Sequence, residues 1–128
     1  MNFSGPVIHG LKNGRKLGFP TANIQTEAAI EAGVYVGKAK FQNQIYNCIV
    51  FVGKSETFNI KKSTYEVHFL HDFNGLEFYN EKVEVDLLVK TRNNKKFDSL
   101  DDLKATLEQD KQEAFTFFSQ NSKTIQNE

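Results

Sequence analysis

Residues 33–52 have the sequence GVYVGKAKFQNQIYNCIVFV and predict a pair of antiparallel strands. From Gly33 onward, β-branched and aromatic residues mix with lysines, a composition typical of a strand. The polar residues 42–44 indicate a tight turn, and Ile45 to Val52 returns as the partner strand. This segment therefore predicts a β-hairpin and places the chain among the mainly-β proteins.

Further segments on both sides of this hairpin have strand-like patterns. Residues 64–71 and 78–90 alternate between apolar and polar side chains, which is typical of half-buried strands. Residues 3–9 indicate a first strand, and because Pro6 cannot donate a ladder hydrogen bond we expect an edge strand or a bulge there. Between these strands we expect one helical turn over residues 26–32 and a polar loop over residues 53–63.

The C-terminal part of the chain predicts one amphipathic helix. Ser99 is a suitable N-cap, and Asp101 and Asp102 follow in the first turn, where the helix dipole favours anions. One apolar stripe predicts a face docked on a core; it consists of Leu100, Leu103, Leu107, Ala114, Phe117 and Phe118. We expect one domain over residues 1–120, followed by a polar tail over residues 121–128.

Five or six antiparallel strands followed by one helix predict a closed or nearly closed β-barrel with the helix against one side, because closure removes free strand edges. The 128 residues suffice for one domain with a core, and 12 phenylalanines supply much of that core. Sixteen basic residues balance 16 acidic ones, which argues against a nucleic-acid partner.

The single cysteine, Cys48, excludes an intrachain disulfide and is expected to be a packed thiol, which favours a reducing, cytoplasmic setting. No apolar run reaches membrane-spanning length, so no membrane partner is expected. His68 and His71 do not have zinc-site spacing with a third ligand, and we expect them to be surface or rim residues.

A long loop over residues 10–23 holds three of the eight glycines and one of the two prolines. Its backbone N–H groups, with Arg15 or Lys16 nearby, suit a phosphate ligand. Thr21 and Asn23 add two neutral oxygen donors suited to a hard cation such as Mg²⁺. The alternative interpretation is an ordinary glycine-rich turn.

Glu66 is a carboxylate inside a strand, on the face that also carries His68 and Leu70. One interpretation is a solvated, outward-facing side chain. The other is a general base that accepts the proton of a substrate hydroxyl as its oxygen attacks phosphorus. The residue pattern leaves both interpretations open.

The sequence resembles the riboflavin kinases (flavokinases) in register from about Phe3 to Asp110. The matching motifs are GRKLGFPTAN at residues 14–23, GVYVG at 33–37, EVH at 66–68 with Asp72–Phe73 after it, and FDSL at 97–100. The resemblance implies a six-stranded antiparallel Greek-key β-barrel with a C-terminal helix packed on it. It also implies transfer of the ATP γ-phosphate to the 5′-hydroxyl of riboflavin, which gives FMN and ADP.

The resemblance assigns a role to each matching residue. Thr21 and Asn23 would hold Mg²⁺ with the nucleotide phosphates, and Glu66 would be the base that faces the flavin hydroxyl. Arg92 would lie on the flavin side of the site. The remaining nucleotide-binding residues belong to the loop before Thr21 and are Gly14, Arg15, Gly18 and Pro20.

The sequence departs from the family pattern on the flavin side, at Glu56, Asn80 and Thr91. These departures keep a second hypothesis open, a non-catalytic flavin- or nucleotide-binding module of the same fold. Many bacterial relatives carry an adenylyltransferase domain before the kinase domain; no such domain precedes this motif, so we expect FMN and not FAD as the product. We expect a monomer.

Overall fold

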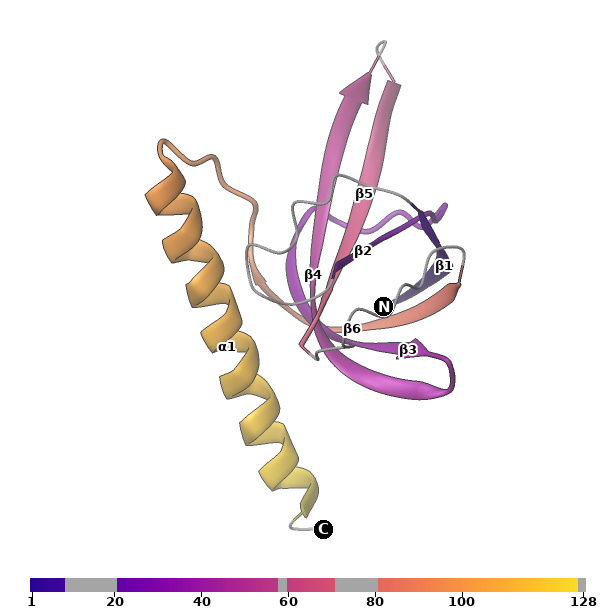
Figure 1. The fold of residues 1–128 in the computed structure, drawn as a ribbon, viewed down its shortest axis with the longest axis vertical. Coiled ribbons are helices and arrows are strands. Elements are labelled where there is room, and N and C mark those ends of the chain that lie inside the picture. Colours follow the sequence, from indigo (N-terminus) through magenta and orange to yellow (C-terminus); the bar gives the residue numbers. More distant parts are fainter. Residues whose placement is uncertain (9–20, 58–59, 71–80, 127–128) are drawn as a thin grey trace.

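A computed structural model describes residues 1–8, 21–57, 60–70 and 81–126 (Figure 1). In these ranges the chain forms strands and one long helix, in the order β1 Asn2–Ile8, β2 Thr21–Ile24, β3 Gly33–Phe41, β4 Gln44–Thr57, β5 Ile60–Phe69, β6 Lys82–Arg92 and α1 Leu100–Gln126.

The six strands close into an antiparallel barrel in the order β1-β2-β5-β4-β3-β6. Strands β3, β4 and β5 follow one another, and β6 returns to pair with β3, which is a Greek-key connection. Helix α1 lies along the outside of the barrel (Figure 1). The predicted six-stranded Greek-key barrel with a packed C-terminal helix is therefore confirmed.

Alternate residues of the strands fill the barrel interior with apolar side chains, among them Phe3, Val50, Tyr65 and Val67. Cys48 belongs to this core, and burial raises the pKa of its thiol well above the ordinary value. The expected packed thiol is confirmed.

The segment between β2 and β3 has no helical turn, so that expectation was wrong. Its backbone is tied to the core instead, because the Tyr65 hydroxyl donates to the Ala28 carbonyl and accepts from the Ile30 amide at 3.3 Å. The Thr26 hydroxyl oxygen also accepts from the Ala28 amide at 3.2 Å. These side-chain hydrogen bonds replace the ones that a helical turn would make.

The β3–β4 hairpin turns at Gln42 and Asn43, whose φ angles are 50° and 66°. Two central residues with positive φ define the turn that matches the twist of the flanking strands. The predicted hairpin is confirmed.

The second hairpin differs from the expected polar loop over residues 53–63. Strands β4 and β5 stay paired from Gly53↔Thr64 to Thr57↔Ile60, and Figure 1 shows this pair projecting away from the barrel. A strand pair that leaves the barrel needs no buried face, so it lacks the apolar alternation that identifies a strand in sequence.

Strand β1 is paired on both sides, with β2 and β6, so the expected edge or bulge at Pro6 was wrong. Its register with β2 covers only Val7 and Ile8. Next to this short register, the Pro6 carbonyl accepts a hydrogen bond from the Gln25 amide at 3.0 Å. A residue without an N–H is tolerated at this position because the regular β1–β2 ladder has already ended.

Helix α1 begins as predicted, since the Ser99 hydroxyl oxygen accepts from the Asp102 amide at 3.1 Å. The predicted stripe packs on the outer faces of β3 and β4 through Leu107, Ala114 and Phe118, with Leu103 and Phe117 partly buried beside them. Leu100 is the exception: it is 59% exposed, because it lies in the first turn, before the helix meets the barrel.

The helix extends to Gln126, so much of the segment expected to be a polar tail is helical. The domain boundary at residue 120 stays a prediction. Although α1 is long, no helix in the described ranges is apolar enough over a sufficient length to cross a membrane.

Candidate active site

The pairing of β2 with β5 brings the predicted site residues together. Asn23 lies opposite Glu66, and Thr21 lies opposite His68. Between them, Ala22 and Val67 point into the barrel core, so the four polar residues lie on the outer face. The two predicted metal ligands and the candidate base therefore share one patch of surface.

The carboxylate of Glu66 is held by the next residue on the same face of β5. His68 Nε2 lies 3.0 Å from Glu66 Oε1, within hydrogen-bond distance. The Glu66 side chain is 32% exposed, whereas that of His68 is only 6% exposed. Glu66 can thus reach a ligand while one of its oxygens is fixed.

His68 is a buried residue, so the expectation of a surface or rim histidine was wrong. Its ring packs against Phe51, with the ring centroids 4.5 Å apart. Phe51 itself packs against the cluster that docks α1. Strand alternation places His68 on the face of Glu66, but its ring is buried against Phe51 of β4, a contact that alternation within one strand does not indicate.

A row of residues crosses four strands from Glu66 toward helix α1. Glu66 is opposite Phe51, Phe51 is opposite Val34, and Val34 is opposite Arg92. Val34 is buried and Phe51 is half-buried at the docked helix. The row joins the candidate base to the residue predicted on the flavin side across a mostly apolar surface.

At the end of this row, Arg92 is bound to the helix. Its Nε and Nη2 atoms donate to the two carboxylate oxygens of Asp110 at 2.8 and 2.7 Å. Nη1 donates to the Asn93 carbonyl at 3.0 Å. The structure thus gives Arg92 a role in joining β6 to α1, and its contact with a flavin stays a prediction.

Several predicted residues lie outside the described part of the chain. They are Gly14, Arg15, Gly18 and Pro20 of the nucleotide loop, together with His71 and Asn80. Thr91, another departure from the family pattern, is described: its hydroxyl donates to the Val34 carbonyl at 3.1 Å, between β6 and β3.

The donor chemistry of the patch suits Mg²⁺. A hydroxyl from Thr21 and an amide oxygen from Asn23 lie on one face, and hard cations prefer oxygen ligands. Within the described ranges, no three or more His, Cys, Asp or Glu residues cluster in a way that could hold a metal ion. A cation bound here would therefore depend on neutral protein donors and on the phosphates of its ligand.

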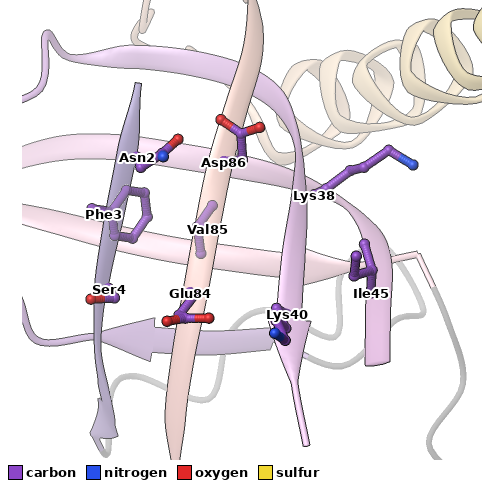
Figure 2. A pocket seen from close by; sticks show the side chains of 9 residues that line it. All are labelled: Asn2, Phe3, Ser4, Lys38, Lys40, Ile45, Glu84, Val85 and Asp86. Carbon is purple, nitrogen blue, oxygen red and sulfur yellow. The ribbon is translucent and has the colours of Figure 1, made fainter. Parts of the chain in front are cut away.

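A separate hollow of about 500 Å³ is lined by residues of β1, β3, β4 and β6 (Figure 2). Its lysines face carboxylates across the strands, Lys38 opposite Asp86 and Lys40 opposite Glu84. Figure 2 shows the Lys38 side chain directed away from Asp86, and its Nζ lies 5.6 Å from the centre of the Phe118 ring. The hollow contains none of the predicted site residues, and its mixed charges favour no particular ligand.

The fold and the patch define a small antiparallel barrel whose outer face offers oxygen ligands and a candidate base beside a docked helix. The family model for flavokinase, described as riboflavin kinase, matches residues 1–118. The chain belongs to the riboflavin kinase family.

Individual relatives agree with this assignment. A bifunctional riboflavin kinase/FMN adenylyltransferase from Haemophilus influenzae is 42% identical over 118 residues, which cover 90% of this chain and 38% of the relative. The human riboflavin kinase is 32% identical over 118 residues, covering 86% of this chain and 76% of the relative. The crystal structure of riboflavin kinase from Trypanosoma brucei has a TM-score of 0.62 and 25% identity, covering 92% of this chain and 79% of that one. The chain spans less than half the length of the Haemophilus relative.

Proposed function

We propose that this chain is an ATP-dependent riboflavin kinase, which transfers the γ-phosphate of ATP to the 5′-hydroxyl of riboflavin and releases FMN and ADP. The observation that carries the proposal is the register of β2 and β5, which sets Asn23 opposite Glu66 on the outer face. Membership of the riboflavin kinase family supports the choice of substrates.

In the proposed reaction, Glu66 acts as the general base. The 5′-oxygen of riboflavin forms a bond to the γ-phosphorus, the bond from that phosphorus to the β–γ bridging oxygen breaks, and ADP leaves with the electron pair. The hydroxyl proton passes to the Glu66 carboxylate. Because most of the catalysis in phosphoryl transfer is positioning and charge stabilisation, a base held at one oxygen suits this task.

Mg²⁺ is the cation that we assign to this patch. Thr21 and Asn23 would hold it together with the nucleotide phosphates, whose charge it would neutralise. The loop before Thr21, with Gly14, Arg15, Gly18 and Pro20, would contact the nucleotide. Its position immediately before β2 supports this assignment, since the chain enters the patch from that loop.

The flavin ring is proposed to lie against Phe51, next to Glu66 in the row and short of Val34, which is buried under α1. Phe51 offers half-buried aromatic surface in the middle of this row, and a flat apolar ring system favours such surface. Asp110 fixes the Arg92 guanidinium at the far end. A flavin here would have its 5′-hydroxyl chain toward Glu66 and its ring beside α1.

We also propose a cytoplasmic, monomeric protein without a nucleic-acid partner. The single cysteine is a buried free thiol, which suits a reducing compartment. The formal net charge is zero, so the chain lacks the overall positive charge that favours sequence-independent binding to nucleic acid.

The test is chromatographic separation of flavins after the protein is incubated with riboflavin, ATP and Mg²⁺. Formation of FMN that stops when Mg²⁺ is chelated would support the kinase and its metal together. Quenching of riboflavin fluorescence without FMN would instead identify a non-catalytic flavin-binding module. Absence of both would overturn the proposal, provided that circular dichroism shows a folded protein.

A further inference from the structure

We propose that His68 is a positioning residue that holds the carboxylate of Glu66 in the orientation needed to accept the substrate proton. This inference rests on the proposed function. Its starting point is the 3.0 Å contact between His68 Nε2 and Glu66 Oε1. The contact fixes one carboxylate oxygen and leaves Oε2 as the oxygen for the substrate hydroxyl.

The chemistry of the two groups fixes the protonation pattern of the neutral ring. An ionised carboxylate can only accept hydrogen bonds, so Nε2 must carry the proton that it shares with Glu66. Nδ1 is then an acceptor. This atom is buried and has no hydrogen-bond partner among the described residues. A buried polar atom without such a partner costs stability, so packing alone gives no reason for a histidine at this position.

The position of the ring is itself fixed. His68 is 4% exposed, its ring packs on Phe51, and Phe51 packs on the helix-docking cluster. The side chain therefore has little freedom to rotate, whereas Glu66 is one-third exposed. A rigid His68 limits the orientations of the more mobile Glu66 carboxylate. Residues that hydrogen-bond to a catalytic group commonly contribute in this way.

Three variants separate positioning from packing. His68→Leu keeps the apolar volume but removes the donor. His68→Gln places an amide N–H at the position of Nε2, and His68→Asn places the same amide one methylene short of Glu66. We expect kcat to fall about 10- to 100-fold in His68→Leu and His68→Asn, with each KM within about twofold of the native value, because the residue acts through Glu66. His68→Gln is expected to recover kcat to within about threefold of the native value.

A double-mutant cycle measures whether the kcat losses at Glu66 and His68 are coupled, which a purely structural role of His68 would not produce. If His68 acts through Glu66, the double variant Glu66→Gln/His68→Leu should be no slower than Glu66→Gln alone. The proposal is overturned if the kcat losses of Glu66→Gln and His68→Leu multiply in the double variant. It is also overturned if His68→Leu keeps the native kcat, or if His68→Gln and His68→Asn have equal kcat. If His68→Leu does not fold by circular dichroism and thermal melting, the comparison of Gln with Asn decides.

Nitrogen NMR of the imidazole gives a test without turnover. In ¹⁵N-labelled protein at a pH where the ring is neutral, we expect the His68 signals of a protonated Nε2 and an unprotonated Nδ1; the opposite tautomer would overturn the proposal. If the native protein makes no FMN, the proposed function fails and this inference fails with it. If the native protein makes FMN and Glu66→Gln does not, but the His68 variants behave otherwise than expected, only this inference fails.

Discussion

Asn23 and Glu66 lie directly opposite each other on the neighbouring strands β2 and β5, with both side chains on the outer face of the barrel. They are far apart in sequence, and only the Greek-key order of the strands makes them neighbours. Directly paired residues on one face of a sheet have Cβ atoms about 4.5–5.5 Å apart. An amide ligand and a carboxylate base can therefore act on a single bound phosphate–hydroxyl pair.

Glu66→Gln should remove the base while keeping the size of the side chain. We expect turnover to fall about 10²- to 10⁴-fold, the range typical of a general base. The melting temperature should change little, because the side chain is one-third exposed. Steady-state FMN formation measures the loss. Glu84→Gln on β6 is the matched control, since its side chain is 54% exposed and lies outside the patch; an equal loss in both variants would contradict a base role for Glu66.

Replacement of Thr21 by alanine should weaken metal binding. Loss of one oxygen ligand is expected to raise the Mg²⁺ concentration needed for half-maximal activity about tenfold. Asn23→Ala should act in the same direction, because Asn23 lies on the same outer face. Mg²⁺ titration of FMN formation at saturating ATP measures the effect. Thr64→Ala, an exposed threonine on β5, is the control, and an unchanged titration for Thr21→Ala would remove that residue from the metal site.

The Arg92–Asp110 pair should be important for stability, and its two partners should not be equivalent. The Asp110 side chain is 1% exposed and that of Arg92 is 22% exposed. Arg92→Met leaves a buried carboxylate without its partner, and we expect a loss of about 3–5 kcal/mol in the free energy of unfolding. The double variant Arg92→Met/Asp110→Leu should recover part of this loss. Urea unfolding measures each value, and a loss below about 1 kcal/mol for Arg92→Met would contradict the importance of the pair.

Cys48 should make stability decrease at alkaline pH. Burial raises the pKa of the folded thiol above the ordinary value of 9.0, so above that pH the unfolded chain loses this proton while the folded chain keeps it. The folded state then binds more protons, and the free energy of unfolding falls as pH rises, by at most about 1.4 kcal/mol per pH unit from this group.

The difference between the native protein and Cys48→Ala isolates that slope from the other groups that titrate at high pH. Denaturant unfolding from neutral to alkaline pH measures it. The native protein should lose stability faster than the variant above pH 9.0. Parallel curves would contradict the assignment.

Sequence patterns predicted most of the strands and the helix, but β2, Thr21–Ile24, begins inside the segment expected to be a loop, because four residues are too few to show a period. The β3–β4 turn at Gln42–Asn43 and the Ser99 cap were predicted because turns and caps depend on adjacent residues. The projecting part of the β4–β5 hairpin, within residues 53–63, differs from the expected loop, since a strand pair that leaves the barrel has no core-facing period. Leu100 was assigned to the docked stripe because periodicity does not tell where a helix first meets the barrel.

The candidate site was predicted residue by residue but not as an arrangement. Strand alternation places Glu66 and His68 on one face, yet the ring of His68 is buried against Phe51 of β4, which is far from it in sequence. The position of Asn23 opposite Glu66 depends on β2 pairing with β5, which no local pattern encodes. The attachment of Arg92 to Asp110 likewise joins two elements only in the folded protein.

The central claim, transfer of a phosphoryl group at this patch, is tested most directly by following the γ-phosphate itself. The protein is incubated with riboflavin, Mg²⁺ and ATP labelled at the γ-position, and the flavins are separated and counted. We expect the label to appear in FMN for the native protein, to be nearly absent for Glu66→Gln, and never to appear when ATP is labelled at the α-position. No labelled FMN from the folded native protein, or equal labelling by Glu66→Gln, would contradict the account.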